Sequence, residues 1–151
     1  MRLITLVFSL SFFALLWSCG GGDTQSAEGQ PEGALSSEME SFAKFYQRFH
    51  ADSLYQIRHI IFPLEGLPDD ADSTTIASGR FRWTKQSWKM QRPFDFEMGE
   101  FGRELKELGP GLVEEIIYHK KLPYVLVRRF SYLGDDWYLI YYAGMNKIRV
   151  E

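Results

Sequence analysis

The stretch P-Y-V-L-V-R-R-F-S-Y-L-G-D-D-W-Y-L-I-Y-Y, from Pro123 to Tyr142, decides the fold of this chain. Two runs of β-branched and aromatic residues flank Gly134, Asp135 and Asp136, which are typical turn formers. This pattern predicts a β-hairpin. Because both faces of the hairpin are rich in apolar side chains, it cannot stand alone in water. We therefore expect the helical segments upstream to cover it.

Two helices are predicted ahead of the hairpin. Ser37 and Glu40 fit a capping box, which predicts a helix that begins at Ser37 and ends near His50. Its apolar face recurs at three- and four-residue spacing through Met39, Phe42, Phe45, Tyr46 and Phe49. Asp52 or Ser53 then caps a shorter helix. This second helix is expected to turn three apolar side chains inward: Leu54, Ile57 and Ile61.

The middle of the chain mixes extended and helical patterns. Ile60–Leu64 predicts an extended segment because it contains a proline, Gly66–Ser78 predicts an exposed loop, and Arg80–Thr84 predicts a short strand. Phe94–Leu108 shows apolar residues at helical spacing before a G-P-G sequence, which predicts a third helix. Leu112–His119 predicts a strand that joins the hairpin. Helices grouped ahead of three long antiparallel strands indicate an α+β fold, with the N-terminal helices packed on a curved antiparallel sheet.

Composition and charge narrow the classes of function. The chain has 151 residues, of which 45% are hydrophobic, so it is long enough for one globular domain and a leader. Its formal net charge is −3, which argues against nucleic acid as a partner. It contains a single cysteine, so no disulfide can form within the chain.

The N-terminal end has the pattern of a lipoprotein leader. Leu3–Trp17 is almost wholly apolar, too short for a membrane span and of the length of a signal-peptide core. It continues into L-W-S-C-G, which resembles a bacterial lipobox. We therefore predict a lipoprotein signal peptide over residues 1–18 and lipidation, as by palmitate, of Cys19. The alternative is an ordinary signal peptide followed by an incidental cysteine.

A lipidated cysteine implies a tethered domain. More than one acyl chain on Cys19 would give a stable membrane anchor. Residues 19–36 are rich in glycine, serine and polar residues, which predicts a flexible linker, and residues 37–151 are predicted to form the folded domain. The acids of the linker are dispersed rather than clustered behind the cysteine. We therefore predict a lipid-anchored protein of the cell envelope, on the outer membrane and facing the periplasm.

Three segments resemble an uncharacterised Bacteroidetes lipoprotein family, domain of unknown function 4348. They are D-S-L-Y-Q-I-R-H-I-I-F-P-L at Asp52–Leu64, W-T-K-Q-S-W-K-M at Trp83–Met90 and D-W-Y-L-I-Y-Y at Asp136–Tyr142. The resemblance extends over roughly residues 40 to 145. It implies a fold similar to nuclear transport factor 2, in which a curved sheet and helices form a cone with an internal pocket. It implies no activity, because the family has no agreed catalytic residues.

One set of residues has the composition of a pocket catalyst. Glu115 and His119 lie four positions apart on a predicted strand and therefore face the same side. Arg128 and Tyr141 of the hairpin could oppose them. An isomerase of this fold type needs a carboxylate base and a hydrogen-bond donor in one apolar cavity. The alternative is that the charged residues face solvent or form a cross-strand ion pair.

Aromatic residues of the later segments are candidates for ligand stacking. A sugar or a planar apolar ligand could stack on the side chains of Trp83, Trp88, Trp137, Tyr138 and Tyr142. The alternative is that these rings belong to the structural core. The predicted ligand-binding set comprises Trp83, Trp88, Arg128, Trp137 and Tyr141.

No metal or cofactor site is predicted. The three histidines, His50, His59 and His119, do not form a metal-binding motif, and lipidation of Cys19 leaves no thiol. Asp135 and Asp136 could bind calcium, although paired carboxylates in a turn are ordinary turn chemistry.

The sequence thus leads to three functional hypotheses. The first is a non-catalytic module that binds a small apolar or glycan-like ligand, or a partner protein, near the mouth of the cone. The second is an isomerase- or hydrolase-like enzyme that uses a pocket carboxylate. The third is a structural or assembly role as a homodimer.

Overall fold

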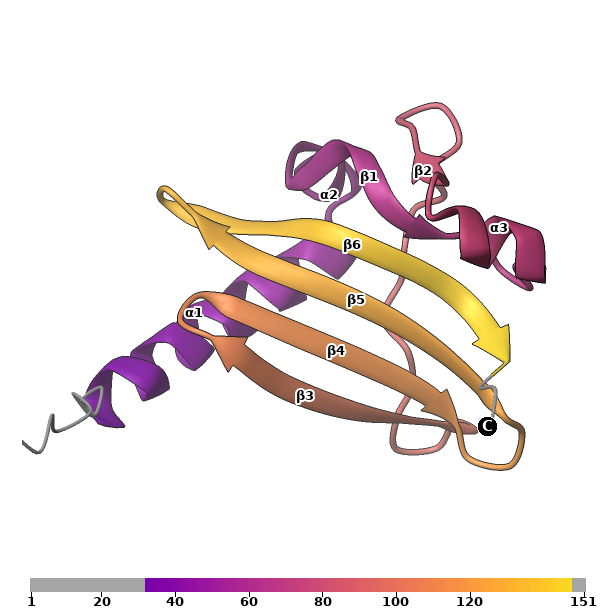
Figure 1. The fold of residues 1–151 in the computed structure, drawn as a ribbon. Helices are drawn as coiled ribbons and strands as arrows, with labels where there is room; N and C mark the ends of the chain where they lie inside the picture. The colour runs from indigo at the N-terminus through magenta and orange to yellow at the C-terminus, as the bar shows by residue number, and fades with distance from the viewer. Residues whose placement is uncertain (1–31, 148–151) are drawn as a thin grey trace, which may run out of the picture.

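Six strands form a single curved sheet that dominates the described part of the chain (Figure 1). The computed structural model describes residues 32–147. The strands are β1 (Ile60–Leu67), β2 (Arg82–Trp83), β3 (Phe101–Gly109), β4 (Leu112–His119), β5 (Tyr124–Leu133) and β6 (Asp136–Lys147). Their order across the sheet is β2-β1-β6-β5-β4-β3. Neighbouring strands are antiparallel except β1 and β6, which run parallel.

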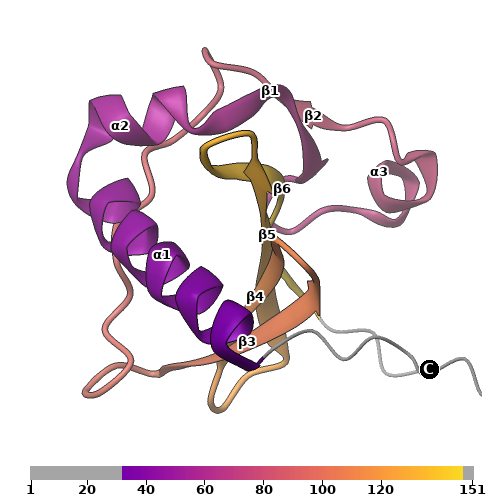
Figure 2. The same ribbon diagram turned by 90° about the vertical axis from the view of Figure 1, so that its left-hand side faces the viewer.

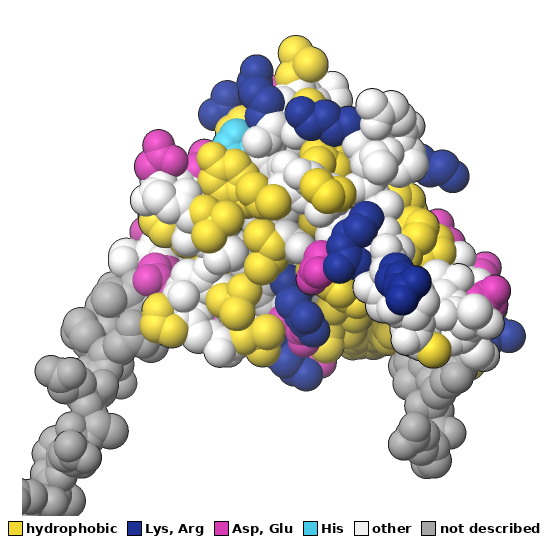
Figure 3. Space-filling model, turned by 45° about the horizontal axis from the view of Figure 1, so that its top comes forward, with side chains coloured by type: hydrophobic (Ala, Val, Ile, Leu, Met, Phe, Trp, Pro, Cys, Tyr) yellow, Lys and Arg dark blue, Asp and Glu magenta, His cyan; other side chains and the backbone are white. Residues whose placement is uncertain are grey.

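Three helices accompany the sheet: α1 (Glu32–Ala51), α2 (Ser53–Arg58) and α3 (Ser73–Ser78). α1 lies across one face of the sheet, and α3 lies beyond the β1 edge on the side away from α1 (Figure 2). α1, α2 and α3 do not cover the other face of β3, β4 and β5 (Figure 1). Figure 3 shows that hydrophobic side chains are interleaved with charged ones on this outward side of the molecule. The described chain is therefore a mixed α+β fold, as the sequence predicts.

Aromatic packing between α1 and the hairpin forms the core. Phe42 meets Phe130 at 5.3 Å and Trp137 at 5.1 Å between ring centroids, and Phe49 meets Phe130 at 5.7 Å. Phe42, Phe49 and Phe130 are almost completely buried. The predicted apolar face of the first helix is therefore confirmed. Edge-to-face rings of this kind add to the stabilisation that comes from burial alone.

The predicted hairpin is confirmed as β5 and β6. Gly134 supplies the turn with a φ of +73°, a left-handed conformation that glycine adopts without strain. Asp136, the first residue of β6, accepts a hydrogen bond from the Tyr55 hydroxyl at 3.0 Å and lies 3.0 Å from His59 Nε2. The carboxylate therefore fastens the hairpin to the α2 region.

The prediction of a helix over Phe94–Leu108 is wrong. The structure has β3 over Phe101–Gly109, paired antiparallel with β4, and residues 94–100 precede it without regular structure. Phe101 and Leu105 lie four positions apart, a spacing that serves the inward face of a strand as well as that of a helix. The segment forms a strand rather than a helix because it pairs along its whole length with β4.

Two details of the predicted helices also differ. α1 begins at Glu32, so the proposed capping box at Ser37 lies inside the helix rather than at its start. Asp52 caps α2 as expected, accepting from the backbone N–H groups of Leu54 and Tyr55. However, α2 buries Tyr55 and Gln56, whereas Leu54 is exposed. α2 has six residues, fewer than two helical turns, and therefore presents only a narrow inward face.

The predicted leader, Cys19 and residues 19–31 of the predicted linker lie outside the described residues. Between residues 32 and 147, no helix is long and apolar enough to cross a membrane. The lipid anchor and the domain boundaries stay predictions.

Candidate functional site

One row of inward side chains crosses four strands and sets the position of the site. In the register of the sheet, Leu105 of β3 faces Glu115 of β4, Glu115 faces Arg128 of β5, and Arg128 faces Tyr142 of β6. Side chains alternate between the two faces of a strand, so the neighbours Val113 and Ile117 point the same way as Glu115 into the core. The strand pattern therefore buries one acid and one arginine beneath α1.

Glu115 is fully buried and hydrogen-bonded from two directions. The Tyr46 hydroxyl donates to Glu115 Oε1 at 2.6 Å, and Arg128 Nη1 donates to Oε2 at 3.2 Å. Arg128 is fully buried as well. The pair is thus a cross-strand ion pair, one of the alternatives that the sequence left open, but in the core rather than at the surface. A buried charge pair is tolerated only when further hydrogen bonds satisfy it.

His50 and Gln91 complete this set. Tyr46 and His50 are one helical turn apart on α1, so they share a face. Arg128 Nη1 lies 2.8 Å from His50 Nε2, and Arg128 Nη2 donates to Gln91 Oε1 at 3.2 Å. We call Tyr46, His50, Gln91, Glu115 and Arg128 the buried network. Among the described residues, Arg128 Nε has no hydrogen-bond partner.

The geometry assigns the tautomer of His50. Its Nε2 faces a guanidinium, which can only donate, and its Nδ1 lies 2.9 Å from the Tyr46 carbonyl oxygen, which can only accept. The ring is therefore neutral, with the proton on Nδ1. Burial and the charge of Arg128 lower the pKa of His50 to about 4, which agrees with this assignment.

The tyrosines of the site remain neutral at physiological pH. Burial, reinforced by the charge of Glu115, raises the pKa of Tyr46 well above its usual value. Burial raises the pKa of Tyr142 to about 12. Both hydroxyls therefore act as hydrogen-bond donors: that of Tyr46 to Glu115 and that of Tyr142 to Gln91 Oε1, at 3.2 Å.

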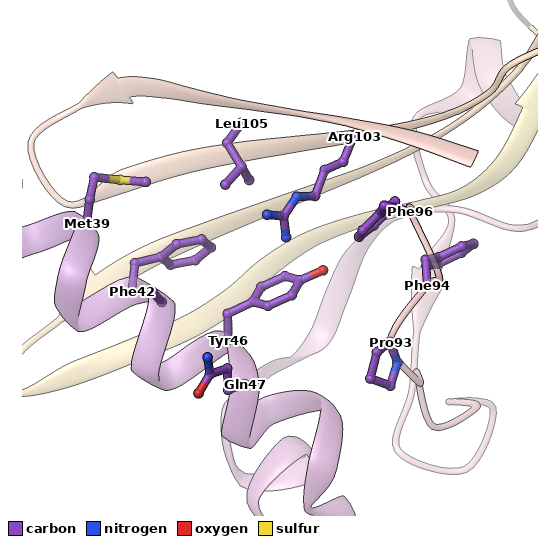
Figure 4. Close-up of a pocket in the computed structure, with 10 residues that line it drawn as sticks. Met39, Phe42, Tyr46, Gln47, Pro93, Phe94, Phe96, Arg103 and Leu105 are labelled. Atoms are coloured by element: carbon purple, nitrogen blue, oxygen red, sulfur yellow. The ribbon is translucent and has the colours of Figure 1, made fainter. Parts of the chain in front are cut away.

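A largely apolar pocket of about 350 Å³ opens beside the buried network (Figure 4). It lies between α1, β3 and the segment that precedes β3. Its lining residues are Met39, Phe42, Ala43, Tyr46, Gln47, Pro93, Phe94, Phe96, Arg103 and Leu105. Tyr46 belongs to both the pocket and the network, so it connects the two. We call this cavity the α1–β3 pocket.

Arg103 is the charged residue of the pocket lining. Its guanidinium carbon lies 5.3 Å from the Tyr46 ring centroid and 5.1 Å from the Phe96 ring centroid. Its Nη1 is 3.8 Å from Glu115 Oε1, and 34% of its side chain is exposed. Figure 4 shows the guanidinium pointing towards the Tyr46 side chain. The pocket therefore combines apolar walls with one cation.

The structure separates His119 from Glu115. The Nε2 atom of His119 is 3.5 Å from a carboxylate oxygen of Glu100. Its Nδ1 accepts from the backbone N–H groups of Lys121 and Leu122, at 3.1 and 3.2 Å. His119 thus supports the turn between β4 and β5. The predicted pairing of Glu115 with Arg128 is present, whereas His119 makes its contacts elsewhere.

Tyr141 also lies apart from the buried network. It pairs in register with Arg129, and the Arg129 guanidinium carbon lies 4.8 Å from its ring centroid. Arg129 in turn bonds Glu114 on the outward face. Since Arg128 and Arg129 are consecutive in one strand, their side chains point to opposite faces. Tyr141 is therefore on the outward side of the sheet.

The tryptophans of the predicted ligand-binding set donate their indole N–H groups within the fold. Trp83 donates to the Tyr142 carbonyl at 3.0 Å. Trp88 donates to Gln56 Oε1 at 3.2 Å, and Trp137 donates to Ser41 Oγ at 3.0 Å. Each indole thus has an internal partner, as core tryptophans usually do. A stacking role for them stays a prediction.

Sequence reasoning missed four residues of the site: Tyr46 as a donor, His50, Gln91 and Arg103. One signal was present, because Tyr46 and His50 are polar residues one turn apart on an otherwise apolar helix face. The placement of Gln91 and Arg103 had no comparable signal. Gln91 lies outside regular structure, and Arg103 falls in the segment that was predicted to be helical.

No metal centre is formed in the described range, since residues 32–147 contain no group of three His, Cys, Asp or Glu side chains that could hold an ion. The chain matches no family model, no curated protein and no solved structure at a significant level. Its function therefore has to be inferred from the pocket and the buried network.

Proposed function

We propose that this chain is a lipid-anchored, non-catalytic binding module of the cell envelope that takes a small, largely apolar ligand in the α1–β3 pocket. The observation that carries this proposal is the pocket itself: about 350 Å³, with mostly apolar walls and few polar groups. Ligand sites in proteins have this size and composition. Glu115 and Arg128, which are fully buried behind the pocket, supply a rigid wall, which favours binding without rearrangement.

The lipoprotein family of domain of unknown function 4348 and the cone of nuclear transport factor 2 belong to this proposal. A curved sheet covered on one face by a long helix, with a pocket between them, supports the cone. The lipobox-like sequence ending at Cys19 supports the anchor, and the dispersed acids of the linker support an outer-membrane position facing the periplasm. Fold alone does not define a ligand, so the pocket has to be tested directly.

A thermal-shift screen with metabolites, glycans and envelope extracts tests the binding function. A ligand of the pocket is expected to raise the melting temperature, because it binds only the folded chain. Ala43 is exposed on α1 and lines the pocket, so Ala43→Phe should fill the pocket and abolish the shift. Ala77→Phe, on the exposed surface of α3, is the matched control and should leave it unchanged. A screen without any shift, or a shift that survives Ala43→Phe, contradicts the proposal.

Catalysis by Glu115 is the second candidate function. It is favoured by one observation: Glu115 is buried and accepts a 2.6 Å hydrogen bond from Tyr46, which lines the pocket. A buried carboxylate beside a donor is the arrangement that an isomerase would use. Any ligand found in the screen is therefore incubated with the protein and analysed for chemical change. Product formed by the natural chain but not by Glu115→Gln would favour the enzyme over the binding module.

A homodimer through the outward face of the sheet is the third hypothesis. Tyr118 of β4 exposes 41% of its surface, and it lies on the outward side because Glu115 and Ile117 point inward. Sedimentation of the full chain tests this association. A species that remains monomeric at high concentration removes the hypothesis.

A further inference from the structure

We infer that the α1–β3 pocket selects ligands that carry one carboxylate on an apolar body, and that Arg103 binds this carboxylate. The inference rests on the proposed binding function and adds the chemical class of the ligand. It follows from the balance of charge at the pocket wall, from the position of Arg103 and from the size of the apolar space.

The wall of the pocket has one positive charge in excess. Arg103 and Arg128 are both cations, and Glu115 is the acid placed between them. His50 is neutral because its Nε2 accepts from Arg128, and the Tyr46 hydroxyl is neutral because it donates to Glu115. An excess cation beside apolar walls attracts an anionic ligand.

Asp95, the acid of the lining segment 93–96, forms no ion pair with Arg103 in the described part of the chain. Asp95 lies between the lining residues Phe94 and Phe96. Its Oδ1 accepts from the backbone N–H groups of Glu97 and Met98, at 3.1 and 2.9 Å. Asp95 is thus engaged in its own turn. Within residues 32–147, Glu115 is the acid that comes within 4 Å of Arg103.

Glu115 is a weak partner for Arg103. Its short contacts are those to Tyr46 at 2.6 Å and Arg128 at 3.2 Å, whereas Arg103 is 3.8 Å away, beyond hydrogen-bond range. Arg103 is also the more accessible arginine, because Arg128 is fully buried. A guanidinium presents a fork of donors that matches a carboxylate. Arg103 is therefore placed to receive an acid from the pocket side.

The rest of the pocket sets the size and polarity of the ligand. Met39, Phe42 and Leu105 line the end away from Phe94 and Phe96 (Figure 4), so the side chains at this end of the pocket are apolar. If each ligand atom takes about the volume of a water molecule, roughly 30 Å³, the pocket holds about a dozen non-hydrogen atoms. A ten-carbon monocarboxylate is a ligand of this size.

A comparison of decanoate with decan-1-ol tests the inference. The two probes share the same apolar chain and differ in the charge of the head. Each is titrated by calorimetry into the full chain held in phosphatidylcholine nanodiscs, and empty nanodiscs give the baseline for partition into lipid. We expect decanoate to bind at least about ten-fold more tightly than decan-1-ol, the size of one charge-assisted hydrogen bond.

Variants identify the residue that binds the head group. Arg103→Gln should weaken decanoate binding by about ten-fold and leave decan-1-ol unchanged, because only the head group loses its partner. Arg103→Lys should retain part of the preference. Lys106→Gln makes the same change of charge on the same strand, at an exposed residue outside the pocket, and should have no effect. Should Arg103→Gln fail to fold, the ratio of the two probes on the natural chain decides the preference for a carboxylate, and Arg103→Lys tests the role of Arg103.

The outcomes separate this inference from the function on which it rests. If both probes bind equally well to the natural chain, the pocket is a binding site and the carboxylate preference is wrong. If neither probe binds, both the preference and the pocket function are overturned. If Lys106→Gln weakens decanoate as much as Arg103→Gln does, the effect is one of general charge and Arg103 is not the binding residue.

Discussion

Arg128 is the residue that connects Glu115, His50 and Gln91 within the buried network. It bonds Glu115, His50 and Gln91 while being fully buried, so its loss leaves the Glu115 carboxylate without its counter-ion in the core. A buried charge that loses its partner costs far more than the pair contributes. Arg128 is therefore required for the stability of the fold.

Replacing Arg128 by Met is expected to destabilise the chain by about 3–5 kcal/mol, because Glu115 then stays buried without a hydrogen-bonded counter-ion. The matched control is Arg129→Met, the next residue on the same strand. Arg129 pairs with Glu114 at 2.7 Å on the partly exposed outward face, so its loss should cost less than about 1 kcal/mol. Urea unfolding of the three proteins measures both values. Equal costs for the two variants would contradict the assignment.

His50 should make the stability of the fold depend on pH between about 4 and 6.5. In the folded chain its pKa is lowered to about 4, and in the unfolded chain it is near 6.5. In this window the unfolded chain binds a proton that the folded chain excludes, so stability falls as the pH falls. The contribution of His50 is complete above pH 6.5 and is lost towards pH 4. It amounts to roughly 3 kcal/mol at most, from about 1.4 kcal/mol for each pKa unit between the two states.

The variant His50→Gln isolates this contribution, because the Gln amide oxygen can still accept from Arg128 but cannot titrate. The difference in unfolding free energy between the two proteins is measured by urea titration from pH 7 to pH 4. We expect the difference to shrink as the pH falls. Two curves that stay parallel over this range would show that His50 is not held neutral by the fold.

At the scale of elements, the parallel pairing of β1 and β6 brings the two backbones close together at a single residue. Gly66 of β1 has a φ of +155°, and a Cβ placed there would overlap the carbonyl oxygen of Tyr142 on β6. The atoms nearest to such a Cβ are all backbone atoms of Tyr142, so no flexible side chain can move aside to make room. The parallel pairing of the two strands therefore requires glycine at this position.

We expect Gly66→Ala to destabilise the chain by more than about 1 kcal/mol, since alanine cannot take up the native conformation without pushing β6 away. Gly109→Ala in β3 is the control, because nothing lies within 4 Å of a Cβ at that position. It should be neutral or slightly stabilising. Thermal and urea unfolding measure the two changes. An equal loss of stability for the two variants would argue against the close approach of the β1 and β6 backbones at Gly66.

Local pattern was enough to predict some elements and not others. The hairpin was predictable because its turn residues and β-branched runs are adjacent in the chain. β3 was not, because Phe101 and Leu105 satisfy a helix and a strand equally, and the deciding pairing with β4 is outside the segment. The outward positions Glu104 and Lys106 are polar, but Arg103 on the inward side and the exposed Leu108 break the alternation that would identify a strand.

The candidate site was predictable to the same limited extent. The opposition of Glu115 and Arg128 follows from strands that are neighbours in sequence. The bond from Tyr46 to Glu115 joins residues 69 positions apart and depends on where α1 lies on the sheet. Helix placement is set by side-chain packing over long sequence separations, which a single sequence does not encode in any local pattern.

At the scale of the whole molecule, the predicted lipid anchor depends on Cys19. Wild-type chain expressed in its envelope setting is expected to incorporate labelled palmitate and to sediment with membranes, because acyl chains anchor it. Cys19→Ala should take up no label and should appear in the aqueous fraction. Label retained by Cys19→Ala would place the modification elsewhere, and wild-type chain without label would remove the predicted anchor.

The position of β6 in the sheet has a consequence for how the chain is made. β6 is the final strand of the described chain, yet it lies between β1 and β5 and joins the two halves of the sheet. Until it emerges from the ribosome, Phe42, Phe45 and Phe49 of α1 have no complete surface to pack against. The domain can therefore close only after β6 has been synthesised. This order of assembly is compatible with the predicted export, because a narrow translocation pore admits only unfolded chain.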